Sequence, residues 1–416
     1  MIEIRSKLRI IALLTLLALG MAVFSSPAQA APTSLDKTWM TNGKVYATVL
    51  SKNRKVLYIG GSFDQVRPTA SAPGLKVSNV AAINVASGKP LKGFRPQVSG
   101  KSGEVHALAV QGGTLFIGGN FGAVSGSPRQ HLAAVDADSG ALSSFSPDMG
   151  SSNSAVYELK ARGSTLYVGG GFQKVNGKAR ENLAAFNIST GNLSPSWRPK
   201  ADLGKVRSIE FATDGNSMFI GGNFQSVVGT NGKQDNRQSV ARIFTASGNL
   251  HPWKIPGRFI IGLDQNAWDL DVTEGRLFVG FGAKKNSAAS FYLTNGNIGG
   301  LDWRFITAGN VQAIALSPNR SQLYIGGHFG ISETNQKVCD GRFLRGIASL
   351  DPATGGLKPA SAAGAGGCGW LPNLQGPARN YNGVWSFSPV GNRLWVGGGF
   401  TGVSGVKQQN LASFTF

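Results

Sequence analysis

The sequence predicts an all-β protein, a seven-bladed β-propeller of four-stranded blades. An apolar-apolar-Gly-Gly-x-Phe string, first present at Tyr58–Phe63, recurs along the chain, and short strand-like segments separated by turn residues surround each copy. No segment after residue 30 keeps an apolar period of 3.6 residues, so we expect no long helices. Glycine makes up 58 of the 416 residues without a Gly-X-Y period, which excludes collagen and indicates many tight turns.

The first glycine of the string marks each of seven units. Six copies are regular, and the fifth, Phe278–Gly282, is degenerate. The marking glycines are Gly60, Gly118, Gly169, Gly221, Gly280, Gly326 and Gly397. In the second unit the four expected strands are residues 105–110, 115–121, 132–136 and 142–145. Four short antiparallel strands per unit match the blade of a propeller, whose circular closure protects sheet edges.

Residues 1–30 have the pattern of a secretory signal peptide. Basic residues precede an apolar run of fifteen residues from Ile10 to Phe24, and Ala28-Gln29-Ala30 has the small-x-small pattern of a cleavage site. The run is shorter than the ~20 residues that a membrane-spanning helix needs. We therefore expect a secreted, extracellular protein that does not span the membrane, with a single propeller domain over residues 31–416.

The two ends of the chain predict how the ring closes. Segment 410–414 resembles the third strand at 182–186, and segment 35–39 resembles the fourth strand at 193–197. An N-terminal strand is therefore expected to complete the last blade, with Thr38–Met40 paired beside Leu411–Phe414.

Only two cysteines are present, Cys339 and Cys368. An even number in an exported protein favours a disulfide between them, although two free thiols remain an alternative. Two sulfurs without a neighbouring histidine argue against a structural zinc site.

One complete unit carries a family resemblance. Its pattern, LYVGGGF-x-x-V-x-G followed by NLAAFN-x-x-TG-x-L-x-x-x-W, runs from Leu166 to Trp197. It resembles the secreted bacterial propeller repeats related to the delta-sixty repeat, and the resemblance covers nearly all of Trp39–Phe416. The resemblance implies the propeller fold and a bacterial, secreted protein, but no activity. The glycine pair is also similar to kelch repeats, although the spaced Tyr and Trp of kelch are absent.

Connection lengths predict that one face of the disc is elaborated. The turns between first and second strands and between third and fourth strands are short, as in Gln111–Gly113 and Asp138–Gly140. Long insertions fall in the other connections, which antiparallel order places on the opposite face, where binding residues usually lie. The loop residues that we expect to be mainly exposed there are Arg67, Arg258, Arg342, Arg345, Trp370, Arg379 and Tyr381.

The innermost strands predict a second feature, a ring at the mouth of the central channel. Its members follow the opening Val or Ala of each innermost strand and are Tyr46, His106, Tyr157, Arg207, Trp268, Gln312 and Trp385. The next positions on the same side are expected to be apolar, as in Leu108 and Val110. Two roles remain open: the ring caps the packing between blades, or it contacts a ligand.

The chain is strongly basic. It has 41 basic and 21 acidic side chains, a formal charge of +20 and a pI near 10.2, which excludes an acidic disordered protein and favours polyanionic partners. No nucleic-acid-binding motif is present, so sequence-specific binding of nucleic acid is not expected. Arg129, Arg180 and Arg237 recur three residues before a third strand, and this recurrence predicts a structural role in covering a strand or joining two blades.

Patterns for metal or cofactor chemistry are missing. The four histidines, His106, His131, His251 and His328, form no H-x-H or H-E-x-x-H pattern, and no G-x-S-x-G motif is present. Asp136-Ala137-Asp138 resembles part of a calcium loop but lacks the later acidic ligands. We therefore predict no metal, cofactor or catalytic residue.

Two functions remain. The first is a monomeric, non-enzymatic binding module for anionic surface polymers, glycans or an exported protein. The second is a secreted polysaccharide-active glycoside hydrolase or lyase that uses carboxylates at the channel mouth as acid and base. Its candidates are Glu104, Glu158, Glu210, Asp264, Asp269 and Asp271. Two carboxylates converging with an Arg or Tyr in one deep pocket would favour the enzyme.

Overall fold

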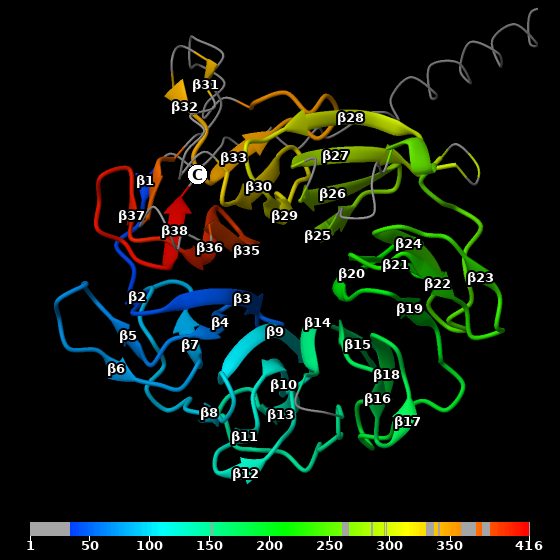
Figure 1. The fold of residues 1–416 in the computed structure, drawn as a ribbon. Coiled ribbons are helices and arrows are strands. Elements are labelled where there is room, and N and C mark those ends of the chain that lie inside the picture. The colour runs from blue at the N-terminus through cyan, green and yellow to red at the C-terminus, as the bar shows by residue number, and fades with distance from the viewer. Residues whose placement is uncertain are drawn as a thin grey trace, which may run out of the picture.

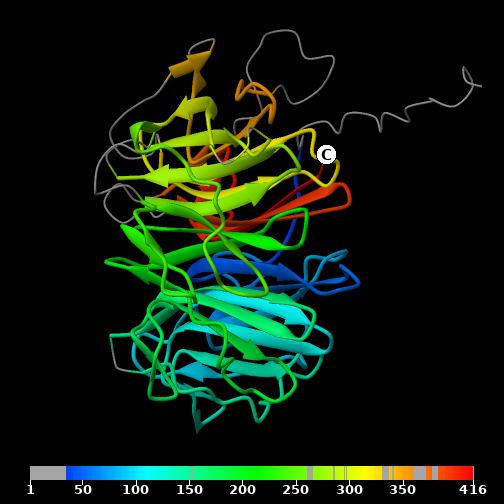
Figure 2. The same cartoon turned by 90° about the vertical axis from the view of Figure 1, so that its right-hand side faces the viewer.

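A computed structural model describes residues 34–150, 153–259, 266–283, 286–294, 296, 298–329, 337–339, 342–358, 372–376 and 383–415. Their regular secondary structure is almost entirely β-strand, with one short 3-10 turn, η1 (Gly257–Phe259), and turns and loops between the strands. The sheets stand around a central axis (Figure 1). Figure 2, turned by 90°, shows successive sheets one above the other. No helix in the described part of the chain is long and apolar enough to cross a membrane. The predicted signal peptide lies outside the described residues.

Three strands recur in antiparallel order in seven of the sheets. The innermost strands are β3 (Lys44–Leu50), β9 (Glu104–Gln111), β14 (Ala155–Arg162), β20 (Val206–Phe211), β25 (Asn266–Val272), β29 (Val311–Leu316) and β35 (Gly383–Val390). The second strands are β4 (Val56–Ser62), β10 (Thr114–Asn120), β15 (Thr165–Gly171), β21 (Ser217–Gly222), β26 (Arg276–Gly282), β30 (Leu323–Gly327) and β36 (Arg393–Gly399). The third strands are β7 (Val80–Asn84), β13 (Leu132–Asp136), β18 (Leu183–Asn187), β24 (Val240–Phe244), β27 (Ser287–Tyr292), β33 (Ile347–Leu350) and β38 (Leu411–Thr415).

A fourth strand is present in only two of these sheets, in the part of the chain that the structure describes. One contains β28 (Leu301–Ile306) beside β27, and the other contains β1 (Ser34–Leu35) beside β38. Elsewhere the expected fourth strand is reduced to one bridge with the third: Ile83↔Pro90, Val135↔Leu142, Phe186↔Leu193, Ile243↔Leu250 and Leu350↔Leu357. The expectation of four-stranded blades is wrong for these sheets. Prolines such as Pro195 follow the bridge in several units, and proline has no N–H to continue a ladder.

Where the fourth strand is missing, recurring arginines and tryptophans form hydrogen bonds with backbone carbonyls in its place. Arg180 Nη2 donates to the Ser194 carbonyl at 2.9 Å, and Arg237 Nη2 donates to the His251 carbonyl at 3.1 Å. This confirms the predicted strand-covering role of the repeated arginines. The aromatic residue that follows then reaches the next sheet, as when Trp197 Nε1 donates to the Thr245 carbonyl at 3.1 Å.

The N-terminal strand closes the last sheet with residues other than those predicted. Ser34 and Leu35 pair with β38, and Asp36 N donates to the Ser413 carbonyl at 2.8 Å. The predicted segment, Thr38–Met40, does not pair there. Instead Met40 begins β2 (Met40–Thr41), which pairs with β5 (Gln65–Arg67). The Asp36 carboxylate fixes this register, because it accepts bonds from two β38 hydroxyls and pairs with Arg393.

The loops after the second strands carry small hairpins. These are β5 with β6 (Leu75–Lys76), β11 (Ala123–Val124) with β12 (Ser127–Pro128), β16 (Lys174–Val175) with β17 (Lys178–Ala179), β22 (Ser226–Val228) with β23 (Gln234–Asp235), and β31 (Lys337–Cys339) with β32 (Arg342–Phe343). Four short strands that precede an innermost strand pair with strands of these loops. They are β2 with β5, β8 (Val98–Ser99) with β11, β19 (Lys200–Asp202) with β22, and β34 (Leu374–Gln375) with β37 (Gly402–Val403). The V-x-G motif forms the hairpin turn, with φ of 49° at Ser125 and 78° at Gly126.

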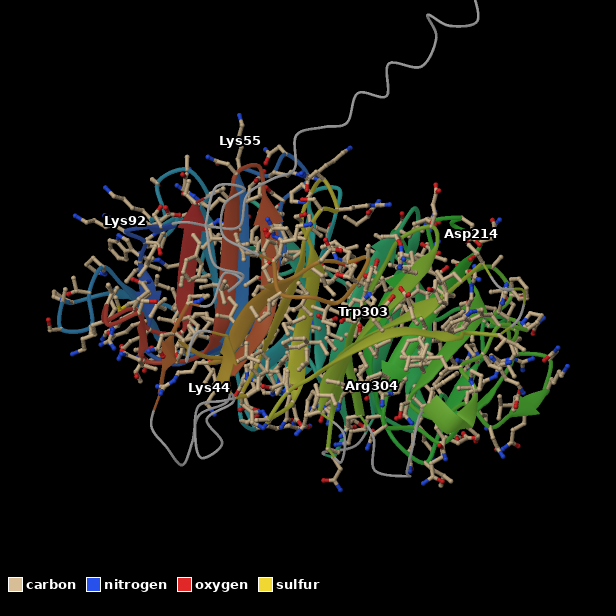
Figure 3. All side chains as sticks on the ribbon, turned by 90° about the horizontal axis from the view of Figure 1, so that it is seen from above. Lys44, Lys55, Lys92, Asp214, Trp303 and Arg304 are labelled. Atoms are coloured by element: carbon tan, nitrogen blue, oxygen red, sulfur yellow. The ribbon has the colours of Figure 1, made fainter. Side chains whose placement is uncertain are left out.

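The two faces of the disc differ as the connection lengths predict. Figure 3 shows Lys55, Lys92 and Asp214, which lie in or near short connections, toward one face, and Lys44, at the start of β3, toward the other. The apolar core lies between neighbouring sheets, where Leu115 and Ile117 pack with Tyr58 and Val80. The predicted disulfide cannot be placed, because Cys368 and the side chain of Cys339 lie outside the described part of the chain.

Candidate functional site

Each innermost strand contains a β-bulge at the same place. In β3, Val45 is opposite Gly61 and Ala47 is opposite Gly60, so Tyr46 has no partner in the register. The other six strands skip His106, Tyr157, Arg207, Trp268, Gln312 and Trp385. A bulge redirects the side chain of the extra residue. All seven residues predicted for the ring are therefore bulged residues.

The repeated glycine pair lies opposite the bulge and permits it. A Cβ on Gly60 would lie 2.5 Å from Val105 Cγ1 of the next sheet, and a Cβ on Gly61 would overlap the carbonyl oxygen of Lys44. The first glycine thus lets the next sheet approach, and the second lets the innermost strand of its own sheet bulge.

The aromatic members of the ring contact one another around the channel. The Tyr46 ring lies 5.0 Å from that of His106 and 5.5 Å from that of Trp385, between centroids. His106 continues to Tyr157 at 5.4 Å, and Trp385 continues to Trp268 at 5.5 Å. The arc therefore runs without a break from Tyr157 to Trp268.

Arg207 closes this arc. Its guanidinium carbon lies 5.2 Å from the centroid of Tyr157 and 4.1 Å from that of Trp268, so the cation bridges the two ends of the arc. Trp268 and Trp385 contact each other directly, so Gln312, which lies between them in the order of the repeats, is not part of the chain of ring contacts. This residue is only 6% exposed.

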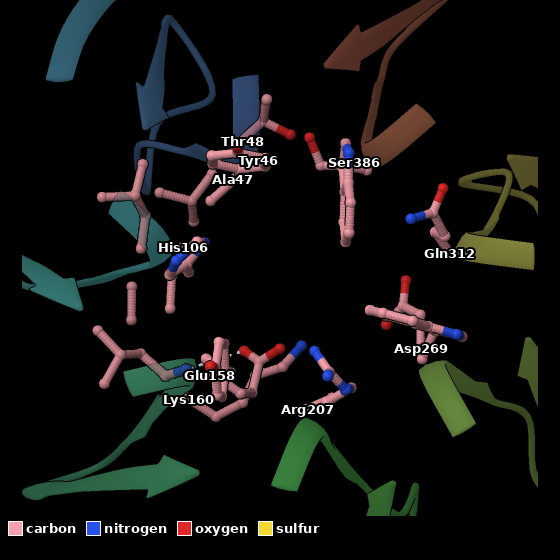
Figure 4. Close-up of a pocket in the computed structure, with 18 of the residues that line it drawn as sticks. Tyr46, Ala47, Thr48, His106, Glu158, Lys160, Arg207, Asp269, Gln312 and Ser386 are labelled. Carbon is pink, nitrogen blue, oxygen red and sulfur yellow. Dashed lines mark hydrogen bonds between the residues drawn. The ribbon is translucent and has the colours of Figure 1, made fainter. Parts of the chain in front are cut away.

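The ring lies over a cavity of about 550 Å³. Figure 4 shows Arg207, Gln312, Glu158 and Asp269 directed into it from four different strands. Its other side is lined by small or apolar residues of β3 and β9, including Ala47 and Ala107. The cavity is thus polar on the side of β14, β20 and β25 and mostly apolar opposite.

The expected positions below the ring are wrong by one residue. Leu108 was expected to follow His106 on the channel side, but it is buried and its Cδ1 lies beside Gly60 of the preceding sheet. Val110 likewise packs against the core between sheets. A bulge shifts the alternation by one residue and so reverses the sides of all residues after it. The intervening residues, such as Glu158 and Lys160, therefore face the channel, and Leu108 and Val110 only border the cavity.

That reversal turns five charged side chains toward the channel, namely Glu158, Lys160, Glu210, Asp269 and Asp271. Lys160 Nζ pairs with Glu210 Oε2 at 2.7 Å. Both oxygens of Asp269 accept backbone N–H groups, from Leu270 at 2.9 Å and from Ile314 of the next sheet at 2.9 Å. The carboxylate of Asp271 makes the equivalent pair of bonds with Val272 and Leu316, both at 2.7 Å. These two aspartates tie neighbouring innermost strands together.

Burial changes the protonation of these carboxyl groups. It raises the pKa of Glu158 to about 8, with the charges of Asp269 and Glu210 adding to the effect and Lys160 opposing it. Burial also raises the pKa of Asp269 to about 6 and that of Asp271 to about 7. Burial disfavours the charge on Lys160, but Glu210 and Glu158 hold its pKa well above the usual value. Glu158 is therefore mainly protonated at neutral pH.

A separate carboxylate lies at the mouth. Glu104 Oε2 is 3.5 Å from His106 Nε2, and Tyr46 Oη donates to Glu104 Oε1 at 3.4 Å. The hydrogen bond with His106 is the main cause that lowers the pKa of Glu104. Glu104 therefore orients two ring members.

The predicted loop residues are not brought together in the described structure. Arg67 is half-buried and donates to Gln409 Oε1 at 2.7 Å, and Arg345 is also half-buried, so neither is mainly exposed as expected. Arg67 is kept from solvent because β5 pairs with β2 and lies near the loop before β38. The side chains of Arg258 and Arg342 and the residues Asp264, Trp370, Arg379 and Tyr381 lie outside the described residues.

Sequence reasoning missed the role of the residue before each third strand. Asn79, Asn182 and His131 have φ of 66°, 65° and 66° there, and Asn182 Nδ2 reaches the Ala201 carbonyl at 2.6 Å. The recurring Asn was the available signal, since Asn tolerates the left-handed region. The predicted turn at Asp136 is confirmed, because its Oδ1 accepts from Ser139 N at 2.8 Å. Among the described residues, no three His, Cys, Asp or Glu are grouped to hold a metal ion.

Comparisons with known proteins bear on the fold. No family model and no curated protein matches the chain. The chain is similar to the WD40 β-propeller domain of Doa1, with a TM-score of 0.51, 11% identity, and 92% and 97% of the two chains covered. It is also similar to the β-propeller domain of Cps50 (Swd1) from Myceliophteria thermophila, with a TM-score of 0.53, 12% identity, and 90% and 98% covered. The chain therefore has a β-propeller fold, and these identities carry no further conclusion.

Proposed function

We propose that the chain is an exported, monomeric, non-enzymatic binding module and that the ring at the channel mouth is its ligand site. In this proposal residues 1–30 are a signal peptide, and the protein belongs with the secreted bacterial propellers of the delta-sixty type. The seven recurring sheets are seven blades, and β1 closes the last of them. The observation that carries the binding function is the closed ring of bulged side chains over the cavity.

Unpartnered polar atoms favour ligand contact over a role in packing alone. Within the described residues, no hydrogen-bond partner is present for Arg207 Nε, Trp268 Nε1, Gln312 Oε1, Trp385 Nε1 and Ser386 Oγ. Buried polar atoms are almost always paired in folded proteins, and five unpaired ones lie close together here, in the ring and in Ser386 beside it. The residues that carry these atoms all line one cavity, which supports a ligand site there.

Of the expected ligand classes, a glycan fits this site best. A cavity of about 550 Å³ with aromatic walls and a few polar groups has the size and composition of a small-molecule site. A protein partner would need about 800 Å² of matching surface, which a cavity of this size does not offer. Sugar rings present both C–H faces for the aromatic side chains and hydroxyl groups for the polar atoms.

Isothermal titration of the purified protein against a panel of neutral and acidic oligosaccharides tests this proposal. Trp268→Ala should weaken binding at least tenfold, because an anchor that fills a pocket contributes ~2 kcal/mol or more. Phe244→Ala is the matched control, since Phe244 is an exposed aromatic in β24, outside the ring. Absence of binding to every saccharide, or equal losses in the two variants, would refute the ring as the site.

A specific observation also supports the second candidate, a polysaccharide-active hydrolase or lyase. Glu158 and Asp269 share the cavity with Arg207 and Tyr157, and a general acid needs a raised pKa such as that of Glu158. The binding module remains preferred, because Asp269 is engaged by two backbone N–H groups. Release of reducing ends, or of unsaturated products that absorb in the ultraviolet, would decide for the enzyme if Glu158→Gln abolished it.

A further inference from the structure

The guanidinium of Arg207 is partly buried and has no hydrogen-bond acceptor among the described residues. The inference drawn from it rests on the proposed glycan-binding function. Its guanidinium lies between the Tyr157 and Trp268 rings, and its Nε has no hydrogen-bond partner. Neither an ion pair nor a hydrogen bond joins its side chain to any residue that the structure describes. Burial accordingly lowers the pKa of Arg207.

Elsewhere the fold supplies acceptors to arginines that are buried or half-buried. Arg237 Nε pairs with Asp235 at 3.1 Å, and Arg242 Nη2 pairs with Asp214 at 2.8 Å. The buried Nε–H of Arg207 is costly to leave without an acceptor, because it has given up water without a replacement, and no acceptor of the described protein faces the rest of the guanidinium. Arg207 therefore differs from these arginines in a way that packing does not explain.

The carboxyl groups deeper in the channel do not neutralise Arg207. Glu210 is paired with Lys160, and Asp269 accepts backbone N–H groups. Glu158 lies in the same cavity but forms no ion pair with Arg207, and its high pKa keeps it mainly uncharged at neutral pH. An anion that entered the mouth would therefore meet an unneutralised guanidinium first.

A second cation lies on the same side of the mouth. Lys205 Nζ is 3.4 Å from Tyr157 Oη and 5.3 Å from the centroid of that ring, and the residue is exposed. Tyr157 is thus flanked by two positive charges. With a formal net charge of +20, the whole chain also attracts anions toward this mouth.

We propose that the ligand is an acidic saccharide and that Arg207 receives its oxyanion, a uronic acid carboxylate or a sulfate ester. The planar guanidinium can donate two parallel hydrogen bonds to either group, which a lysine cannot reproduce. The sugar ring would then rest against the neighbouring indoles of Trp268 and Trp385. The oxyanion supplies the acceptor that the described protein does not.

The test compares matched ligands by isothermal titration. The first pair, oligogalacturonate and its methyl ester, shares a sugar ring and differs in charge, so it tests for a carboxylate. The second pair, a sulfated oligosaccharide and its desulfated form, tests for a sulfate ester. Wild-type protein should bind one acidic member about 10–100-fold more tightly than its neutral partner, as expected for a charge-assisted, bidentate contact. Arg207→Met should abolish this preference but retain binding of the neutral form, and Arg207→Lys should keep part of the preference.

Arg162→Met is the matched control, because Arg162 is exposed on the short-turn face and also stacks on an aromatic ring, that of Phe211. It should leave the preference unchanged. If wild-type protein bound both members of each pair equally, the inference would be overturned while the proposed function stood. A preference that persisted in Arg207→Met would overturn the assignment to Arg207. If Arg207→Met failed to fold, the wild-type ratio and Arg207→Lys would still decide. Absence of binding to all four ligands would remove the proposed function itself.

Discussion

In six of the seven sheets a glycine pair lies opposite the bulge, and this pair gives a sharp test of how the ring is built. Gly119 lies opposite Val105 in the second sheet, just where the register skips His106. A Cβ on Gly119 would lie 2.9 Å from Val105 Cα and would overlap the carbonyl oxygen of Glu104. Both neighbours are backbone atoms, so Gly119→Ala can be accommodated only if β9 and β10 move apart at the bulge.

The expected cost follows from this overlap. Overpacking that shifts backbone costs about 1–3 kcal/mol, and two backbone contacts place Gly119→Ala near ~3 kcal/mol. Unfolding entropy of about 2.1 cal/mol/K per residue over roughly 380 residues gives about 0.8 kcal/mol/K, so Tm should fall by about 4 °C. Because His106 lies in the displaced bulge, saccharide affinity should fall as well.

Gly113→Ala is the matched control in the same sheet. Gly113 is exposed in the turn between β9 and β10, and a Cβ there would have no heavy atom within 4 Å. It should be neutral or stabilise the protein by about 0.4–1 kcal/mol, because alanine restricts the unfolded chain. Urea unfolding followed by tryptophan fluorescence measures both variants. Equal midpoints for the two would refute the requirement for Gly119 opposite the bulge of β9.

Two further predictions concern closure and pH. Asp36→Ala should destabilise the protein by about 2 kcal/mol, because the carboxylate holds two β38 hydroxyls and Arg393. Asp138→Ala, an exposed turn variant, should change the urea midpoint little, and equal effects would contradict the closure role. Glu158 has a folded pKa of about 8, above its usual 4.5, so its contribution to stability is complete below pH ~4.5 and is lost as pH rises through ~8. Glu158→Gln should therefore raise Tm relative to wild type more at pH 9 than at pH 5, and an equal difference at both pH values would count against the raised pKa.

The repeated string identified most of the strands and all members of the ring. Apolar residues followed by two glycines form the second strand in six of the seven recurring sheets, whereas β26 has Phe281 after Gly280. Counting back to the preceding apolar run locates the innermost strand. Alignment of those runs then selected Tyr46, His106 and their counterparts, which line one cavity. These predictions succeeded because the same local contacts are repeated along the chain.

Which residues of each innermost strand face the channel could not be predicted, because the sequence carries no mark of the bulge that shifts the alternation by one residue. Leu108 was therefore assigned to the channel but is mostly buried between sheets and only borders the cavity, into which the charged Glu158 and Lys160 are turned. The pairing of Ser34 and Leu35 was also missed. It depends on side-chain bonds from Asp36 across the whole length of the chain, and no local pattern indicates such bonds.

The bulge also explains where this repetitive sequence varies. The residue before each bulged position is Val45, Val105, Val156, Val206, Ala267, Val311 or Val384, and each of these is fully buried in the core. The bulged residue itself has no partner in the ladder, so the fold places little restriction on its identity. In the seven repeats that position holds two Tyr, two Trp, one His, one Arg and one Gln. A residue that served packing alone would repeat as its buried neighbour does. The diversity at the one position that the fold leaves free is what the proposed ligand site requires, because the ring can then vary without disturbing the packing of the blades.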